Sequence, residues 1–185
     1  MEPVDGPKRV VIVGAGPAGM EAARTAAMRG HDVVLFERDQ RMGGQVNLVM
    51  TMPKRGNFEE VILWFERQLP KLGVDVRLGV EADAKTVPSE SPDVILVATG
   101  STPFVPEVTG ANLPHVHTAR EVLADDTVAG RNILVFDVGG RAAGATTADH
   151  VAAKRPNVRF VTGMETVASE IWMVFVARGA CTGRG

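Results

Sequence analysis

The feature that most constrains this chain is the stretch Lys8–Glu37, which reads as a strand, a glycine turn, a helix and a second strand. Val10–Val13 form a short apolar run rich in β-branched residues, typical of a parallel strand buried on both faces. The turn has the spacing GxGxxG: Gly14 permits a tight turn, Gly16 lets the backbone approach a pyrophosphate, and Gly19 lets the helix lie close to the sheet. This order predicts an α/β fold with a Rossmann-like parallel sheet and helices on both faces.

The helix and the acid of this stretch indicate what it binds. The pattern predicts a helix over Pro17–Arg29 with Gly30 as its stop, and the free N–H groups at its start would face phosphates. Glu37 closes the second strand, where its carboxylate can accept hydrogen bonds from ribose hydroxyls. Because a carboxylate repels a 2′-phosphate, FAD or NAD fits better than NADP, and neighbouring Arg38 weakens this preference only slightly. We therefore predict a dinucleotide site, with a plain structural βαβ unit as the alternative.

Charge and cysteine content exclude several other functions. The net charge of -2 and the lack of a basic run argue against nucleic acid as a partner. The single cysteine, Cys181, rules out an internal disulfide, a CxxC redox pair and a cysteine-based metal cluster, and we expect no metal site. No segment has the apolar length of a signal peptide or a membrane span, so a cytoplasmic protein without membrane contact is the expectation.

Two loops that follow strands can add to the dinucleotide site. Gly43–Gln45, the tripeptide Gly-Gly-Gln, stands where the chain can fold back over a cofactor, with a flexible surface loop as the alternative. The apolar run Asp93–Ala98 is the best candidate for a central parallel strand. Thr99 and Gly100 follow it, and small residues there would let the chain pass beside a ligand at the carboxyl end of the sheet. Considered alone, this second motif is better explained as a simple tight turn.

Periodicity predicts one long helix and one strand between these loops. Asn57 can cap the helix, Pro70 should end or kink it, and Gly73 marks its stop. A strand is expected over Val74–Leu78. The apolar stripe of the helix is expected to be core, and Trp64 in particular to pack rather than to stack on a base. The stripe comprises Val61, Ile62, Trp64, Phe65, Leu69 and Leu72.

A proline-rich connector without periodicity, Ser101–Thr118, separates two units. Its histidines, His115 and His117, have no acid or cysteine at ligand spacing, so we expect exposed or backbone-bonded side chains. Thr118 is expected to cap a short helix that runs through Leu123. These observations predict a Rossmann-like dinucleotide-binding unit over 1–102, a connector over 103–130, and a partial unit of the same kind over 131–185 with an atypical tail.

Residues 131–162 repeat the strand-turn-helix-strand pattern with altered chemistry. Asp137 occupies the place of the first glycine and Ala142 that of the third. The carboxylate would oppose an incoming pyrophosphate, an effect that Arg141 could offset in part, and no acid follows the last strand to bind a ribose. An inactive NAD(P) site is favoured over a working one, and both readings stay open.

The tail carries an almost wholly apolar segment, Ile171–Ala177, followed by only eight residues. A final strand, a partner-binding segment and the scar of a truncated reading frame all fit this pattern. Cys181 is expected to be incidental rather than reactive.

Several motifs together resemble a known family. The segments VVIVGAGPAGMEAA, VVLFE, MGGQ and ILVATGSTP are similar to the flavin-binding region of the two-dinucleotide-binding flavoprotein reductases. More closely, GGQVNL, RGNFEEVILWFERQLPKLGVDVRLG and TAREVL resemble the C-terminal FAD/NAD(P) region of 2,4-dienoyl-CoA reductase and trimethylamine dehydrogenase-type NADH:flavin oxidoreductases. The likeness covers roughly Lys8 to Thr162.

The resemblance implies a cofactor and a partner. It also implies an FAD-binding first unit over 1–102 and a partial NAD(P)-binding-like second unit over 131–185. In that family a reduced nicotinamide cofactor passes hydride to FAD, and electrons continue through an iron–sulfur cluster to FMN in a TIM barrel. FAD is therefore expected here, NAD(P)H is possible, and an FMN/iron–sulfur TIM-barrel domain or chain would be the partner, because this chain contains neither the barrel nor the cluster cysteines. By resemblance, the FAD-binding residues are Gly14, Gly16, Pro17, Ala18, Gly19, Glu37, Arg38, Gly43, Gly44, Gln45, Ala82, Thr99 and Gly100.

Two functions stay open at this point. The first is an FAD-binding oxidoreductase module that relays electrons between a nicotinamide cofactor and an acceptor on another domain or chain. The second is a non-catalytic module that holds ADP or FAD, favoured by Asp137 and by the lack of the family's return segment, which completes the flavin domain. A truncated fragment of a larger flavoprotein reductase is a further alternative. No side chain is a convincing general acid, base or nucleophile, and the sequence does not specify the oligomeric state.

Overall fold

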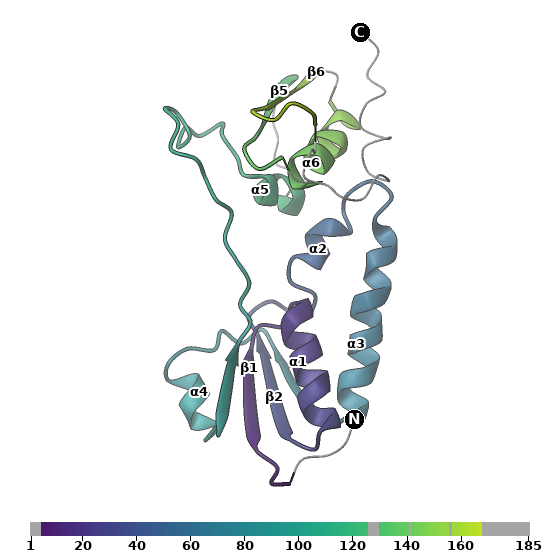
Figure 1. The fold of residues 1–185 in the computed structure, drawn as a ribbon, viewed down its shortest axis with the longest axis vertical. Coiled ribbons are helices and arrows are strands. Elements are labelled where there is room, and N and C mark those ends of the chain that lie inside the picture. The colour runs from purple at the N-terminus through teal and green to yellow at the C-terminus, as the bar shows by residue number, and fades with distance from the viewer. Residues whose placement is uncertain (1–4, 126–129, 141, 156, 168–185) are drawn as a thin grey trace. The chain divides into compact units, whose positions relative to one another are not determined.

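The computed structural model describes residues 5–125, 130–140, 142–155 and 157–167. These residues form two compact units (Figure 1). The N-terminal unit consists of residues 5–50 and 56–102, and the second unit consists of residues 51–55 and the described residues from Pro103 onward. The assignment of FAD to the first unit and of NAD(P) to the second remains a prediction.

The N-terminal unit is built on a four-stranded parallel sheet with the order β3-β2-β1-β4. Its strands are β1 (Arg9–Val13), β2 (Asp32–Glu37), β3 (Asp75–Leu78) and β4 (Val94–Val97). Its helices are α1 (Pro17–Met28), α2 (Val46–Val49), α3 (Glu59–Lys71) and α4 (Thr86–Ser89), with a 3-10 turn at Gly56–Phe58. This arrangement confirms the Rossmann-like α/β fold predicted from the first strand, turn and helix.

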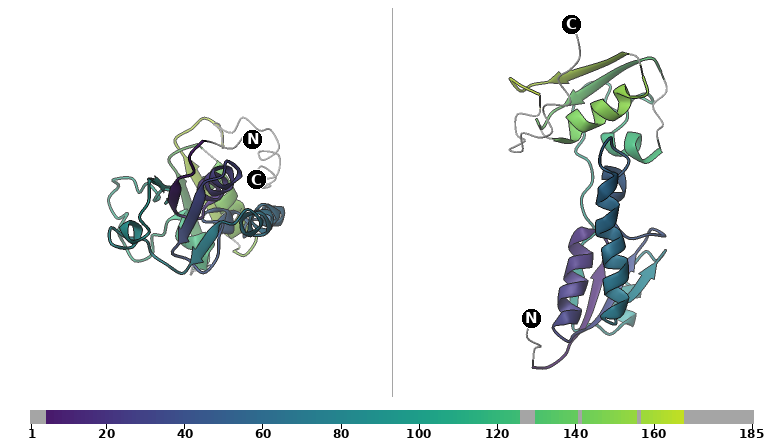
Figure 2. Two further views of the ribbon diagram at one scale, coloured as in Figure 1. Left: turned by 90° about the horizontal axis from the view of Figure 1, so that it is seen from below. Right: turned by 90° about the vertical axis from the view of Figure 1, so that its right-hand side faces the viewer.

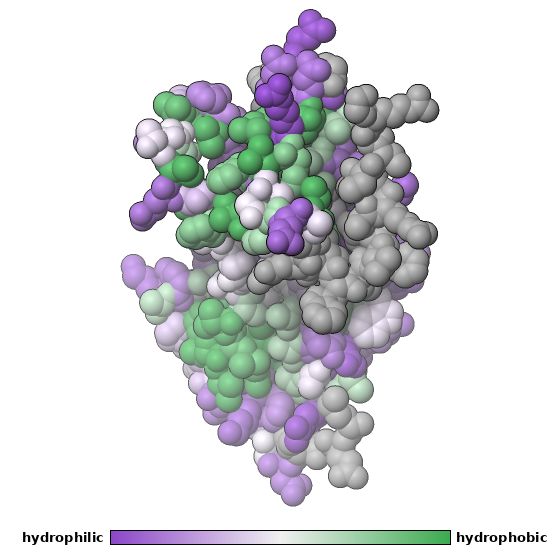
Figure 3. Space-filling view, turned by 45° about the horizontal axis from the view of Figure 1, so that its top comes forward, coloured by the Kyte–Doolittle hydropathy of each residue, from purple (hydrophilic) through white to green (hydrophobic). Residues whose placement is uncertain are grey.

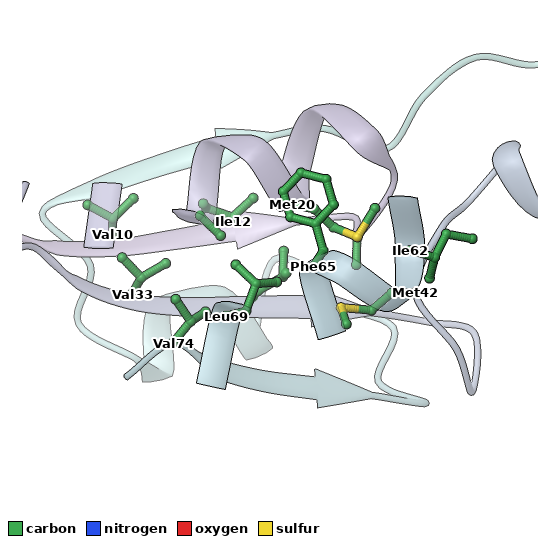
Figure 4. Packing of buried hydrophobic residues seen from close by; sticks show 12 residues of the cluster. Val10, Ile12, Met20, Val33, Met42, Ile62, Phe65, Leu69 and Val74 are labelled. Atoms are coloured by element: carbon green, nitrogen blue, oxygen red, sulfur yellow. The ribbon is translucent and has the colours of Figure 1, made fainter. Parts of the chain in front are cut away.

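Alternation along the strands divides the apolar core between the two faces of the sheet. Val10 and Ile12 of β1 point to the face that α1 and α3 cover (Figure 4). Val11 belongs to a second cluster on the other face, together with Phe36 of β2 and Val87 of α4. Figure 2 shows α1 and α3 side by side on one face. Since full burial of one such side chain is worth about 1.5–3 kcal/mol, these two layers hold the unit together.

The helix α3 differs from the prediction at its start and along one face. It begins at Glu59, and Asn57 lies in the preceding 3-10 turn, so Asn57 does not cap it. Trp64 and Val61, both expected in the core, are 45% and 43% exposed. The guanidinium of Arg24 lies 5.7 Å from the centre of the Trp64 ring. A helix packed on one side buries only a narrow stripe at i, i+3 and i+7, and here that stripe is Ile62, Phe65 and Leu69.

The glycines predicted as helix stops serve as such. Gly30 follows α1 with φ of 89°, and Gly73 follows α3 with φ of 75°. Both values lie in the left-handed region that favours glycine after a helix. Pro70 lies in the last turn of α3, which ends one residue later at Lys71.

The strand β4 lies at an edge of the sheet, so the prediction of a central strand is wrong for the part of the chain that the structure describes. There β4 pairs with β1 alone. Ile95, Leu96 and Val97 are 49%, 39% and 74% exposed. Figure 3 shows a patch of hydrophobic surface on the N-terminal unit. The apolar run identified the strand correctly, but its place in the sheet depends on which other strands are present to pair with it.

The second unit is a smaller strand-helix-strand. The strands β5 (Asn132–Asp137) and β6 (Asn157–Thr162) pair in parallel, and α6 (Ala142–Ala152) lies between them in the sequence. The helix α5 (Ala119–Asp125) precedes them. This confirms the prediction of a second, incomplete Rossmann-like lobe.

The start of α5 confirms the cap predicted at Thr118. The Glu121 N–H donates to Thr118 Oγ1 at 3.3 Å, and the Glu121 carboxylate accepts from the Thr118 N–H at 2.6 Å. This reciprocal pair is a capping box. The connector before it has no helix or strand, and its His115 and His117 are exposed, both as expected. Among the described residues, no helix is both long and apolar enough to cross a membrane, and the tail segment Ile171–Ala177 with Cys181 lies outside them.

Candidate functional site

Two glycines of the first turn are required by the fold itself. Gly14 has φ of 103°, and its N–H donates to the Phe36 carbonyl at 2.8 Å. A Cβ on Gly14 would lie 2.5 Å from the carbonyl oxygen of Ala98. A Cβ on Gly19 would lie 1.8 Å from the carbonyl oxygen of Gly14. Any larger residue at either position would therefore force the turn, the helix and β4 apart.

Gly16 stands in a different environment. Its φ of -70° and ψ of 177° form an extended conformation that any residue adopts. No atom lies within 4 Å of the position that its Cβ would take. Neither the backbone nor protein packing requires a glycine here. The open space at Gly16 fits the predicted close approach of a pyrophosphate to the backbone.

The start of α1 presents hydrogen-bond donors to this region. The helix begins at Pro17, with Gly16 as its N-cap, and it has neither a side-chain cap nor an acidic residue in its first turn. Pro17 suits this position because it has no N–H to leave unpaired. The N–H groups of the first turn, including that of Ala18, therefore receive no side-chain cap, and they carry the positive end of the helix dipole. Such a terminus fits the negative charge of a phosphate.

Glu37 ends β2 beside the turn and is 7% exposed. Its Oε2 accepts from the Ala15 N–H at 2.7 Å, and its Oε1 accepts from the Asp39 N–H at 3.0 Å. Each carboxylate oxygen has two lone pairs, so acceptor capacity is left for a hydroxyl. The contact of Glu37 with a ribose stays a prediction. Its structural contact to Ala15 was not anticipated from the sequence. The neighbouring Arg38 side chain is 63% exposed.

The loop of Gly43 and Gly44 folds back onto the first turn. The Gly43 N–H donates to the Ala15 carbonyl at 2.9 Å. A Cβ on Gly44 would lie 3.1 Å from the Cα of Gly16. The backbone of this segment is therefore bonded to the first turn, as a loop that folds back over the site requires. Two segments separated by almost thirty residues thus meet at Gly16.

Gln45 connects this loop to the end of β4. Its Nε2 lies 3.4 Å from Ser101 Oγ and 3.5 Å from the Ser101 carbonyl oxygen. A Cβ on Gly100 would lie 3.7 Å from the same Nε2. Thr99 precedes Gly100 and is exposed. Thr99 and Gly100 were both predicted as site residues, but Ser101 was not. The only feature of the sequence that pointed to Ser101 was its position next to Gly100.

Ala82 lies beyond the end of β3, near the strand that carries the acid. The Val80 N–H donates to the Glu37 carbonyl at 2.9 Å, and Ala82 follows two residues later. Ala82 packs with Phe36 and Val87 on the α4 face of the sheet. The structure therefore places Ala82 near the end of β2. The segment that holds Ala82 follows β3 and is separate from the glycine loops.

A separate group of charges stabilises the sheet. Glu90 pairs with Arg77 of β3 at 2.5 Å and with Arg9 of β1 at 2.7 Å, and its side chain is 14% exposed. Hydrogen bonds from Arg77 and then Arg9 hold the pKa of the Glu90 carboxyl below its ordinary value, and those to Asp75 and Glu90 raise the pKa of Arg77. These pairs join β1 and β3 to the segment before β4, so their role is structural.

Comparison with known proteins agrees with this geometry. The sequence matches the family model described as pyridine nucleotide-disulphide oxidoreductase over residues 8–171. Bilirubin reductase of Mediterraneibacter gnavus is 38% identical over 168 residues, which cover 91% of this chain and 26% of that protein. NADH oxidase of Thermoanaerobacter brockii is 40% identical over 166 residues, covering 89% and 26%. The solved complex of 2-naphthoyl-CoA reductase with 2-naphthoyl-CoA superposes with a TM-score of 0.86 at 33% identity, covering 94% of this chain and 26% of that one.

The chain spans about a quarter of the length of these relatives, which therefore carry further sequence. The matches extend across both units of the fold and include the glycine turn, the acid and the two loops. They confirm the resemblance predicted from the motifs. This chain belongs to the pyridine nucleotide-disulphide oxidoreductase family, whose members are two-dinucleotide-binding flavoproteins.

Proposed function

We propose that this chain is an FAD-binding oxidoreductase module that relays electrons between a nicotinamide cofactor and an acceptor on another domain or chain. The observation that carries the proposal is the open space at Gly16, which lies before the uncapped start of α1. Glu37 lies beside the same turn and retains acceptor capacity. When bound, FAD supplies the hydride and electron chemistry, and the protein supplies binding and orientation.

Each part of the site has a proposed role toward FAD. The backbone at Gly16 and the first amides of α1 would hold the pyrophosphate. Glu37 would accept hydrogen bonds from the adenosine ribose, with Arg38 beside it. The loops that meet at Gln45 would run along the phosphates and the ribityl chain and close the pocket. In full, the proposed FAD-binding residues are Gly14, Gly16, Pro17, Ala18, Gly19, Glu37, Arg38, Gly43, Gly44, Gln45, Ala82, Thr99 and Gly100.

The acceptor is proposed to lie in sequence that this chain does not contain. The relatives are about three and a half times as long, and their names include a reductase of bilirubin and an oxidase of NADH. We propose a TIM-barrel domain or chain carrying FMN and an iron–sulfur cluster as the partner, supported by the motif resemblance and by that additional length. A cytoplasmic location is proposed on the sequence alone.

A second candidate is a module that holds ADP or FAD without taking part in electron transfer. Asp137 favours it, because an acid replaces the first glycine of the second turn. The two candidates share the first turn and differ in whether a nicotinamide cofactor reduces the bound flavin.

An absorbance spectrum separates the two candidates. The purified chain is incubated with FAD, freed of unbound FAD, and recorded before and after anaerobic addition of NADH. A flavin spectrum that bleaches supports the relay, and one that persists supports the holding module. If the wild-type chain retains no FAD, or if Gly16→Val retains as much FAD as the wild type, the proposed site is wrong.

A further inference from the structure

The turn between β5 and α6 has the same position in its unit as the first turn, but its side chains are arranged differently. Asp137 stands in place of Gly14, Gly139 in place of Gly16, and Ala142 in place of Gly19. Ala142 carries a Cβ at the position that matches Gly19, where a Cβ in α1 would lie 1.8 Å from a carbonyl oxygen. The second turn is therefore built around another contact.

That contact is between the Asp137 side chain and α6. Asp137 is 8% exposed. A Cβ on Gly144 would lie 2.7 Å from both Cγ and Oδ1 of Asp137. The carboxyl group thus packs directly against the first turns of α6 and occupies the volume between the helix and the end of β5.

Asp137 also takes up a donor of the turn. The Gly139 N–H donates to Asp137 Oδ1 at 3.3 Å. In the first turn, the corresponding residue, Gly16, faces open space. In the second turn, the Gly139 N–H therefore donates to the Asp137 carboxylate. A dinucleotide phosphate would need the same N–H.

The second oxygen of this carboxylate remains without a partner. Asp137 Oδ2 is buried and accepts no hydrogen bond from the described residues. A buried carboxylate at a helix start is stabilised by the helix dipole, as a bound phosphate would be. A dinucleotide pyrophosphate placed here would meet that negative charge at close range, in surroundings where water screens it poorly.

We propose that Asp137 excludes a dinucleotide pyrophosphate from the second turn by occupying its place at the start of α6 and by adding a negative charge there. Asp137 is thus a specificity-determining residue: it keeps a dinucleotide from binding at the second turn. If a nicotinamide cofactor reduces the bound flavin, it does so without being held by the β5–α6 turn.

This inference does not depend on the function proposed for the first turn, because the test removes that turn. The probe is NAD⁺, titrated calorimetrically into the full chain carrying Gly16→Val, which fills the open space at the first turn. Three proteins are compared: Gly16→Val alone, Gly16→Val with Asp137→Gly, and Gly16→Val with Asp137→Asn. Asparagine keeps the size of the side chain and the acceptor for the Gly139 N–H, so this variant preserves the fold if glycine does not.

We expect no NAD⁺ binding by Gly16→Val alone and measurable binding once Asp137 is replaced. Removing one negative charge close to the pyrophosphate should strengthen NAD⁺ binding. The dissociation constant should fall at least about tenfold below the weakest value that the titration of Gly16→Val can detect. Gly139→Val added to the Asp137 variant should abolish the regained binding and so locate it at the second turn. Two results overturn the proposal: NAD⁺ binding to Gly16→Val alone that Gly139→Val removes, or no gain in any Asp137 variant that folds.

Discussion

A Cβ on Gly19 would lie 1.8 Å from the carbonyl oxygen of Gly14, whereas a Cβ on Gly16 would meet nothing within 4 Å. The three glycines of one motif therefore serve two purposes. Gly14 and Gly19 let the strand, turn and helix pack together, and Gly16 leaves space in front of the helix. This distinction separates variants that affect folding from variants that affect binding.

Gly16→Val should abolish FAD binding and leave the fold intact. The extended backbone at Gly16 tolerates valine, and the side chain would project into the open space. Loss of the preferred N-cap residue should cost less than about 1 kcal/mol of unfolding free energy. Thermal melting followed by circular dichroism tests the fold, and quenching of flavin fluorescence tests binding. Binding at the wild-type affinity would show that the site lies elsewhere.

Gly19→Ala should destabilise the N-terminal unit. One methyl group would collide with the Gly14 carbonyl, and overpacking of this kind costs about 1–3 kcal/mol. Gly16→Ala is the matched control, since it adds the same group to the same turn where it meets nothing. Urea denaturation should separate the two variants clearly. Equal stability of the two proteins would contradict the close approach of α1 to the turn.

Glu37→Gln should weaken both folding and FAD binding. Each Glu37 oxygen accepts from a backbone N–H, and an amide must turn its NH₂ toward one of these donors. Loss of one buried hydrogen bond to a charged group costs about 1–3 kcal/mol. Glu81→Gln is the control, because Glu81 is exposed. Denaturant titrations with and without FAD measure the two effects, and an unchanged midpoint for Glu37→Gln without FAD would rule out the structural role.

Stability should fall in acid partly through Glu90. Its pKa is lowered from the ordinary value of 4.5 by hydrogen bonds from Arg77 and Arg9. Because the folded pKa lies below the unfolded one, the stabilising contribution is fully present above pH 4.5 and is lost as the pH falls through the lowered pKa. The difference in unfolding free energy between wild type and Glu90→Gln should be largest near neutral pH and shrink below pH 4.5. A difference that stays constant down to strongly acidic pH would show that the ion pairs do not contribute.

Gly144→Ala should destabilise the second unit, and Asp137→Gly should relieve the effect. The added Cβ would lie 2.7 Å from Asp137 Cγ, so the collision exists only while Asp137 is present. A double-mutant cycle by thermal denaturation measures this coupling, which for directly contacting residues is about 0.5–3 kcal/mol. Strictly additive effects would show that the carboxylate does not pack on α6.

The sequence alone determined the parts of this protein that depend on local spacing. The run Val10–Val13, the glycine spacing and the acid at Glu37 predicted the βαβ unit and its site, because each of these features acts over a few residues. The glycines after α1 and α3 and the capping box at Thr118 were predictable for the same reason.

The tertiary structure decided what depends on residues distant in the sequence. The contact of Gln45 with Ser101, the edge position of β4 and the exposure of Trp64 follow from how separate elements pack. Asp137 shows the difference most clearly. Its place in the motif indicated an acid near a ligand, but not that the fold packs this carboxylate against Gly144 of α6, seven residues further along the chain.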